Sequence, residues 1–209
     1  MTTISPDAAG AVLINVFSVE PGGAVALLTH LDEATAAVMS RQPGFVSANL
    51  HRSKDGTRVT NYAQWRSRAD FEAMLYDPAA QLHMAEARRL GSVEGTLYTV
   101  AHVERAGDGP FIVEGSTPLT LIVVFTCESH EQDELVSYLI GIAQEHSVND
   151  GFISCTIHRS LDGTRLAEYI QWRDQAALSA MAVKPSSQAH FARVKPRTSS
   201  AMYDVIKTF

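Results

Sequence analysis

Three kinds of side chain in this sequence could do chemistry together: an amide, an indole and a set of imidazoles. Asn61 and Trp65 lie four residues apart in N-Y-A-Q-W, and both belong to an apolar run of strand length. Alternate residues of a strand share a face, so this amide and this indole point to the same side. A buried amide needs a hydrogen-bonding partner. The pair therefore indicates either a pocket for an oxygenated aromatic ligand, or a core tryptophan beside an amide bonded to backbone or water.

The histidines are the candidate proton acceptors. His51 precedes the Asn61 strand and His83 lies in a helical stretch, P-A-A-Q-L-H. Imidazole is the usual general base near neutral pH, although a surface or capping role is equally typical of such residues. Arg88 could reach an anionic substrate. The sequence has no metal-ligand spacing, no glycine-rich phosphate loop and no G-x-S-x-G motif, so we expect no metal site.

One stretch of the sequence occurs twice. Residues 44–74 and 151–181 are identical at 17 of 31 positions when aligned at an offset of 107. Such self-similarity marks an internal duplication. Trp65 recurs as Trp172, His51 as His158 and His83 as His190, whereas Asn61 becomes Glu168. We interpret this as two duplicated pockets that diverged, with the first copy keeping the recognisable site.

Each copy reads β-α-β-β-α-β. The expected strands and helices of copy one are strands at 11–19, 45–52, 58–66 and 96–104, and helices at 24–42, from 67 to 77 and at 79–90. Copy two repeats the order with strands at 119–128 and 202–209 around the duplicated hairpin. Ser67 with Asp70, and Ser129 with Gln132, are expected to cap helices. Asp55-Gly56 is a hairpin turn signal.

The expected domains are a flexible N-terminus (1–10), an α+β domain (11–105), a linker (106–118) and a second α+β domain (119–209). Strands such as A-V-L-I-N-V-F-S-V are apolar on both faces, and helices can cover only one of them. We therefore predict two ferredoxin-like α+β units packed sheet to sheet as a barrel, a pseudo-dimer within one chain. The chamber that receives Asn61 and Trp65 is expected between the two halves.

Composition excludes several classes of protein. The net charge is −6 and the basic residues are dispersed, which argues against a nucleic-acid or anionic-membrane surface. The first ten residues show no signal-peptide pattern, and no apolar run approaches the roughly 20 residues that span a bilayer. Cys127 and Cys155 are expected to be buried thiols in a reducing compartment. We expect a cytoplasmic protein.

The order of elements, the P-G-F at the second strand, the N-Y-x-x-W-R-S strand and the F-E-A-M helix resemble the antibiotic biosynthesis monooxygenase family. This resemblance spans nearly the whole chain. It implies that Asn61 and Trp65 act on the substrate and that His51, on the preceding strand, removes a proton. Family members also carry a tyrosine early in the next helix. This chain has Phe71 there, and Leu178 in copy two, so that hydroxyl is absent.

The resemblance implies an oxygenase that uses O₂ to convert a hydroxyanthrone-like or naphthol-like polyketide into a quinone or a ring-opened product. No cofactor is required, or reduced flavin from a flavin reductase serves as a diffusible cosubstrate. The pseudo-dimer could pair further as a homodimer. The residues expected to bind substrate are Phe71, His83, Arg88, Trp172 and Glu168. Two alternatives stay open: a haem-binding relative that uses Asn15 and His83, and a non-catalytic ligand-binding module.

Overall fold

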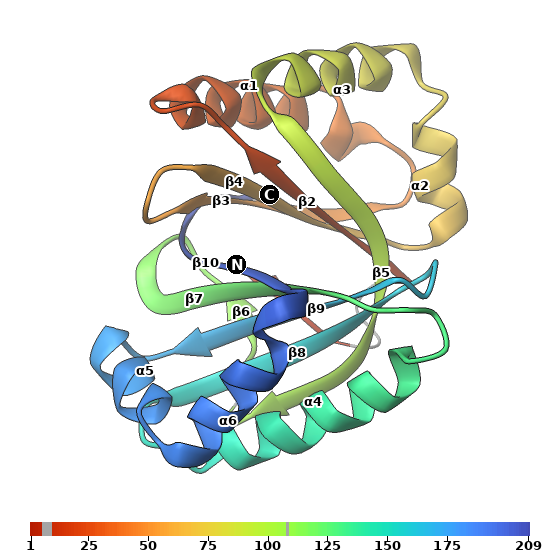
Figure 1. The fold of residues 1–209 in the computed structure, drawn as a ribbon. Helices are drawn as coiled ribbons and strands as arrows, with labels where there is room; N and C mark the ends of the chain where they lie inside the picture. Colours follow the sequence, from red (N-terminus) through yellow and green to blue (C-terminus); the bar gives the residue numbers. More distant parts are fainter. Residues whose placement is uncertain (6–9, 108) are drawn as a thin grey trace.

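Eight antiparallel strands close into one barrel (Figure 1). The structure is a computed structural model that describes residues 1–5, 10–107 and 109–209. Copy one contributes β2 (Ala11–Ser18), β3 (Phe45–Ser53), β4 (Arg58–Trp65) and β5 (Ser92–Arg105). Copy two contributes β7 (Gly115–Thr126), β8 (Phe152–Ser160), β9 (Arg165–Trp172) and β10 (Thr198–Thr208).

The strand order shows how the two copies join. Around the barrel it runs β10-β3-β4-β2-β5-β8-β9-β7 and then returns to β10. The last strand of each copy therefore pairs with the second strand of the other, β5 with β8 and β10 with β3. This confirms the predicted barrel of two ferredoxin-like units. β7 begins at Gly115, inside the segment expected to be a linker, and the domain boundaries themselves remain a prediction.

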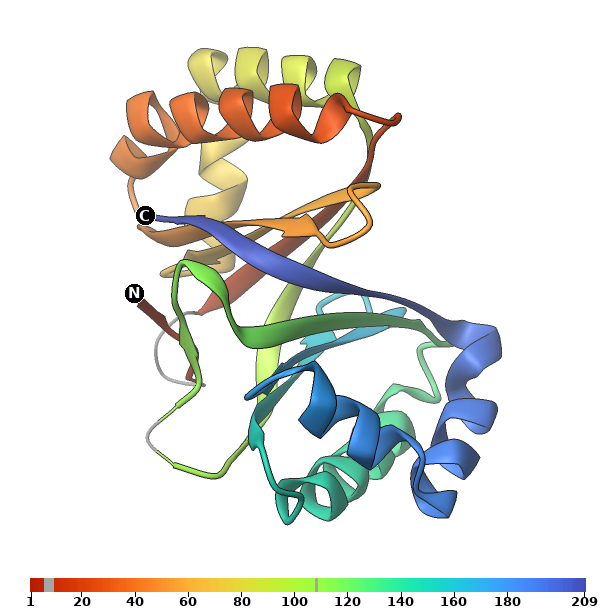
Figure 2. The same ribbon diagram turned by 90° about the vertical axis from the view of Figure 1, so that its left-hand side faces the viewer.

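Helices cover the outside of the barrel, those of copy one on one side and those of copy two on the other (Figures 1 and 2). In copy one they are α1 (Gly23–Ala37), η1 (Met39–Arg41), α2 (Arg68–Met74) and α3 (Pro78–Leu90). In copy two they are α4 (Gln132–Ser147), α5 (Gln175–Ala182), α6 (Pro185–Val194) and η2 (Lys195–Arg197). The Ser67 side chain accepts a hydrogen bond from the Asp70 N–H, so the predicted cap of α2 is confirmed.

Two histidine–tyrosine pairs cross the barrel interior. The Tyr169 hydroxyl lies 3.0 Å from His51 Nε2, and the Tyr62 hydroxyl lies 2.9 Å from His158 Nε2. His51 Nδ1 faces the carbonyls of Asn49 and Thr60, which only accept, so Nδ1 carries the proton and the tyrosine donates to Nε2. Each pair joins copy one to copy two, and the repeat of both residues in the duplicated hairpin makes the two pairs equivalent.

The N-terminal residues pack against one end of this core. β1 (Thr2–Thr3) pairs with β6 (Phe111–Ile112), and Ile4 is buried among the barrel's interior side chains. The duplicated glutamines hold the two short strands: Gln64 donates to the Thr3 carbonyl, and Gln171 donates to the Phe111 carbonyl. Residues 2–4 are thus packed, contrary to the expected flexible N-terminus. Residues 6–9 of that segment lie outside the described residues.

The two duplicated hairpins close with the same hydrogen bonds. In copy one Ser53 Oγ and the Thr57 N–H donate to the Asp55 carboxylate, and Ser160, Thr164 and Asp162 repeat this in copy two. Gly56 and Gly163 adopt φ values of 72° and 78°, which only glycine adopts readily. The repeated S-x-D-G-T-R therefore encodes one turn geometry twice.

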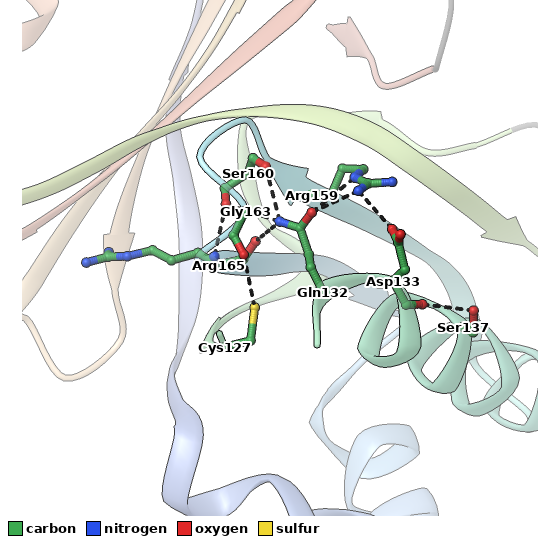
Figure 3. Close-up of polar contacts among 8 residues, drawn as sticks. All are labelled: Cys127, Gln132, Asp133, Ser137, Arg159, Ser160, Gly163 and Arg165. Carbon is green, nitrogen blue, oxygen red and sulfur yellow. Dashed lines mark hydrogen bonds and ion pairs between the residues drawn. The ribbon is translucent and has the colours of Figure 1, made fainter. Parts of the chain in front are cut away.

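Gln132 anchors α4 to the second hairpin (Figure 3). Its Nε2 donates to the carbonyls of Ser160 and Arg165, and its Oε1 accepts from the Arg159 guanidinium. The expected capping role of Ser129 and Gln132 is wrong, because Glu131 is the N-cap residue and makes no side-chain cap bond. The buried amide bridges helix and turn instead.

We expect Gln132→Leu to lower the free energy of unfolding by about 2 kcal/mol, because the Ser160 and Arg165 carbonyls each lose a donor and Arg159 loses one of its two acceptors, keeping Asp133. Urea denaturation measures this change. Gln144→Leu, an exposed position on the same helix, is the matched control and should shift stability by about 0.5 kcal/mol or less. Equal effects of the two substitutions would show that the bridge contributes nothing.

Cys127 and Cys155 are free and buried, as the sequence indicated. Among the described residues, no helix combines the length and the apolar character needed to cross a bilayer.

Candidate active site

Asn61 and Trp65 face the helices of their own copy, not the barrel interior. They line a cavity of about 350 Å³ between the outer face of the copy-one sheet and helices α1 to α3, hereafter the first pocket. The expectation of a chamber between the two halves is therefore wrong for these residues. Because these strands are apolar on both faces, the sequence alone could not show which face of the sheet carries Asn61 and Trp65 towards the helices. A hollow at one end of the barrel does exist, lined in part by Arg58, Tyr98 and Tyr203, but neither Asn61 nor Trp65 lines it.

Two polar atoms at this pocket are left without partners. Asn61 Oδ1 and Trp65 Nε1 are buried, and neither finds a hydrogen-bond partner among the described residues. An orphaned buried polar atom is costly, and ligand binding is one way to satisfy it. The two residues are about 13 Å apart along the strand, from a rise of about 3.3 Å per residue. Between them lies Ala63, a small side chain that leaves room for a flat molecule.

Aromatic rings form the Trp65 end of the pocket. Phe45 and Phe71 each stack edge-to-face on the indole, with ring centroids 5.8 Å away. The position of the family's tyrosine is thus filled by Phe71, which supplies a wall without a hydroxyl. Such T-shaped contacts fix the indole plane and so fix the direction of its N–H.

The Asn61 end holds a second amide that the sequence reasoning did not assign to this site. Asn15 pairs with Asn61 across β2 and β4, and both line the pocket. Gly95 pairs with Asn15 from the other side, and a Cβ at Gly95 would lie 2.1 Å from Asn15 Oδ1. A glycine in a strand is a signal of close approach, here by the Asn15 amide. Asn15 had a role only in the haem alternative.

His83 and Arg88 come to the first pocket from α3. Both line it, and Arg88 is exposed, which places it at the rim. The His83 ring lies 5.5 Å from the His30 ring of α1, centroid to centroid. The predicted substrate-binding residues Phe71, His83 and Arg88 are therefore brought together with Asn61 and Trp65, although contact with a substrate stays a prediction.

His51 is not brought to this site. It pairs in register with Thr60, so its side chain enters the barrel interior on the face opposite Asn61. It is fully buried, and this burial lowers the pKa of its imidazole to about 4. His51 is engaged with Tyr169 and two backbone carbonyls. The structure thus gives this histidine a role in joining the two halves, and does not place it at the first pocket.

Copy two carries an equivalent cavity of about 480 Å³ against α4 to α6, hereafter the second pocket. Glu168 and Trp172 line it where copy one has Asn61 and Trp65, and His190 and Leu178 stand where copy one has His83 and Phe71. Burial in apolar surroundings raises the pKa of the Glu168 carboxyl to about 8. The predicted residues Trp172 and Glu168 thus belong to a separate pocket. Cys155 and His146, which also line it, were missed by the sequence reasoning.

The described residues contain no group of three or more histidine, cysteine or acidic side chains placed to hold a metal ion.

Comparison with known proteins identifies the family of the chain. The profile of the family described as antibiotic biosynthesis monooxygenase matches residues 11–86. A tetracenomycin-F1 monooxygenase from Streptomyces glaucescens is 44% identical over 102 residues, which cover 49% of this chain and 91% of that protein. The chain belongs to the antibiotic biosynthesis monooxygenase family. It is an enzyme of the monooxygenase type found there, and the non-catalytic alternative is set aside.

Solved structures show the same architecture. The crystal structure of an anthrone oxidase-like protein aligns with a TM-score of 0.84 at 22% identity, covering 99% of this chain and 95% of the other. A monooxygenase-like protein from Listeria innocua aligns with a TM-score of 0.57 at 8% identity, covering 97% of each chain. At these identities the likenesses show the fold alone.

Proposed function

We propose that the first pocket oxidises a flat, hydroxylated polycyclic aromatic of the polyketide type with O₂. The observation that carries this proposal is the pair of orphaned polar atoms, one acceptor on Asn61 and one donor on Trp65, at the two ends of an apolar cavity. A hydroxyanthrone or naphthol presents hydroxyl and carbonyl groups on a rigid apolar plane and complements such a frame. The relative named above acts on tetracenomycin F1, which is consistent with this class.

The reaction we assign is the conversion of a ring CH₂ or phenol-activated CH into a carbonyl. For an anthrone, R₂CH₂ + O₂ gives R₂C=O + H₂O, so one oxygen atom enters the product and the other leaves as water. Once deprotonated, such a substrate is electron-rich enough to reduce O₂ directly. The protein then has to bind the anion, orient it and exclude water, and fixed donors in a dry site do this most effectively.

Within this scheme Asn61 and Trp65 bind the oxygen atoms of the substrate, and Phe71 and Phe45 hold its plane. Arg88, at the rim, attracts the phenolate form. His83 replaces His51 as the proposed proton acceptor, because it is the histidine of copy one that lines the pocket. The proton leaves the substrate oxygen or the acidic ring carbon and is taken up by the imidazole.

We expect His83→Gln to reduce kcat by about 10²-fold at pH 7, the lower end of what a general base contributes. The reduction should shrink at higher pH, where the phenol ionises without help. Steady-state O₂ consumption over pH 6–10 measures this. His30→Gln, which alters the neighbouring imidazole on α1, is the control. A pH-independent loss would assign His83 a packing role.

The reaction itself is tested by incubating the chain with a hydroxyanthrone under ¹⁸O₂, first alone and then with a flavin reductase, FMN and NADH. We expect turnover without flavin and one ¹⁸O atom in the quinone by mass spectrometry. Turnover only with the flavin system would assign reduced flavin as cosubstrate. Because Asn15 and His83 line the same pocket, a parallel haem titration tests the haem alternative by its Soret band.

A further inference from the structure

The second pocket is open although its sequence has diverged. It replaces Ala63 of copy one by the larger Ile170, yet its volume is about 480 Å³ against about 350 Å³ in copy one. Protein interiors are close-packed and rarely hold voids larger than a water molecule. A cavity of this size falls in the range of ligand sites, about 300–1,000 Å³. A duplicated site that had lost all function would be free to fill with side chains, and this one has not.

Two residues that line this cavity, Trp172 and Glu168, carry hydrogen-bonding groups. Trp172 Nε1 is buried and finds no partner among the described residues. Phe152 holds the indole by an edge-to-face contact at 5.4 Å between ring centroids. Glu168 is 4% exposed, and Cys155 Sγ, 3.8 Å away, donates a weak hydrogen bond to its Oε1. The second oxygen of the carboxyl therefore remains for a ligand.

The surroundings favour a protonated Glu168 at pH 7. The lining residues that titrate or carry charge, besides Glu168, are Cys155 of β8, His146 of α4, His190 of α6 and Lys195 of η2, and α5 contributes none. Four further groups act on these residues from nearby: Tyr138 and Glu145 of α4, Arg193 of α6 and Glu104 of β5. Burial lowers the pKa of His190 to about 4, so this imidazole is neutral. The Glu168 carboxyl has a pKa of about 8, raised by burial, and is mainly the neutral acid, a hydrogen-bond donor.

We propose that the second pocket is a second ligand site that binds a flat aromatic ketone or quinone, with the Glu168 carboxyl and the Trp172 indole as its two hydrogen-bond donors. The Asn61-to-Glu168 exchange thus turns a site with one acceptor and one donor into a site with two donors. Such a site prefers carbonyl oxygens to hydroxyl groups. If the first pocket produces quinones, the second pocket binds the class of compound that the first one produces. Only this link between the two pockets rests on the proposed function.

The chain has two tryptophans, one in each pocket, so ligand binding to each pocket can be followed separately by tryptophan fluorescence. In Trp65→Phe, Trp172 is the sole indole. We expect 9,10-anthraquinone to quench its fluorescence saturably. Anthracene, which has the same shape and no carbonyl, should bind about tenfold or more weakly, since each neutral hydrogen bond contributes about 1 kcal/mol. Trp172→Phe reports on the first pocket in the same way, so a failure here leaves the proposed function untouched.

The role of Glu168 is tested in the same Trp65→Phe background. Between pH 6.5 and 9.5 the anthraquinone affinity should fall about tenfold as the acid ionises and ceases to donate. Adding Glu168→Gln, which keeps a donor that does not titrate, should abolish this pH dependence. Adding Glu168→Leu should weaken binding about tenfold at pH 6.5.

Three results would overturn the proposal: quenching that never saturates, equal affinity for anthracene and anthraquinone, or Glu168→Leu binding as tightly as the parent. If Trp65→Phe does not fold, ¹⁹F NMR of the wild-type chain labelled with 5-fluorotryptophan replaces fluorescence. One resonance per pocket is then expected, and the Trp172 resonance must shift with anthraquinone and not with anthracene.

Discussion

The double substitution Asn61→Ala with Trp65→Phe is expected to lower kcat/KM for hydroxyanthrone oxidation by about 10³-fold. Removing one preorganised donor to a developing oxyanion typically costs about 10²-fold or more in rate, and the Trp65 N–H is such a donor, whereas Asn61 Oδ1 orients the substrate by accepting from a hydroxyl group. Here one hydrogen-bonding group is lost at each end of the substrate. Trp65→Phe keeps an aromatic ring against Phe71 but removes the N–H together with part of the indole's volume, so stability has to be measured beside activity.

Stability separates a functional loss from a structural one. Asn61 Oδ1 is buried without a partner, so removing it should cost little stability, whereas the smaller ring at the buried Trp65 position should lower the free energy of unfolding by about 1–2 kcal/mol. The variant should stay folded at the assay temperature, and its activity should fall far more than this loss of stability explains. Tyr76→Phe, an aromatic exchange at a position 82% exposed, is the control and should retain full activity. A double variant that unfolds, or one that oxidises the substrate at the wild-type rate, would contradict the assignment.

Replacing both barrel histidines, His51→Gln with His158→Gln, is expected to make the protein far less sensitive to acid. Burial lowers the pKa of each imidazole to about 4, from about 6.5 in the unfolded chain. Their stabilising contribution is therefore complete above pH 6.5 and is lost as the pH falls towards 4. Between pH 7 and 4.5 this amounts to about 2–3 kcal/mol for each histidine, or about 5 kcal/mol for the two.

Urea denaturation at half-unit pH steps measures this effect. Glutamine retains a donor and an acceptor but does not titrate, so at pH 7.5 the double variant should be about 1–2 kcal/mol less stable than the wild type. That difference should vanish or reverse by pH 4.5. His130→Gln, at an exposed position, should follow the wild-type curve. Parallel curves for the double variant and the wild type would mean that these imidazoles are not buried in the neutral form.

The sequence was sufficient to predict most helices and strands, and to predict that the two copies form one barrel. Duplication, hairpin signals and strands apolar on both faces require a second sheet as partner, and the closed barrel satisfies this requirement. Helix α4 shows where local patterns mislead: Ser129 and Gln132 match a capping motif, but the Gln132 amide is committed to the hairpin carbonyls. A tertiary contact of this kind produces no periodic pattern in the sequence from which it could be predicted.

For the site, strand alternation placed Asn61 and Trp65 together correctly, whereas His51 was assigned by family position alone. Counting outward from the Asp55-Gly56 turn would have paired His51 with Thr60 and thus placed it on the face opposite Asn61. Which face the helices cover could not be derived, because β2 and β4 are apolar on both sides. The Asn15–Gly95 approach had one signal, the glycine at position 95, but this residue lies just before the strand expected at 96–104 and was given no role.

The most direct test of the first pocket as the site of oxidation is an anaerobic titration of Trp172→Phe with a hydroxyanthrone, followed by the fluorescence of Trp65. The account predicts saturable quenching, with a dissociation constant that matches the KM for oxidation once O₂ is admitted. Full turnover by a protein whose Trp65 emission never changes on substrate addition would contradict it.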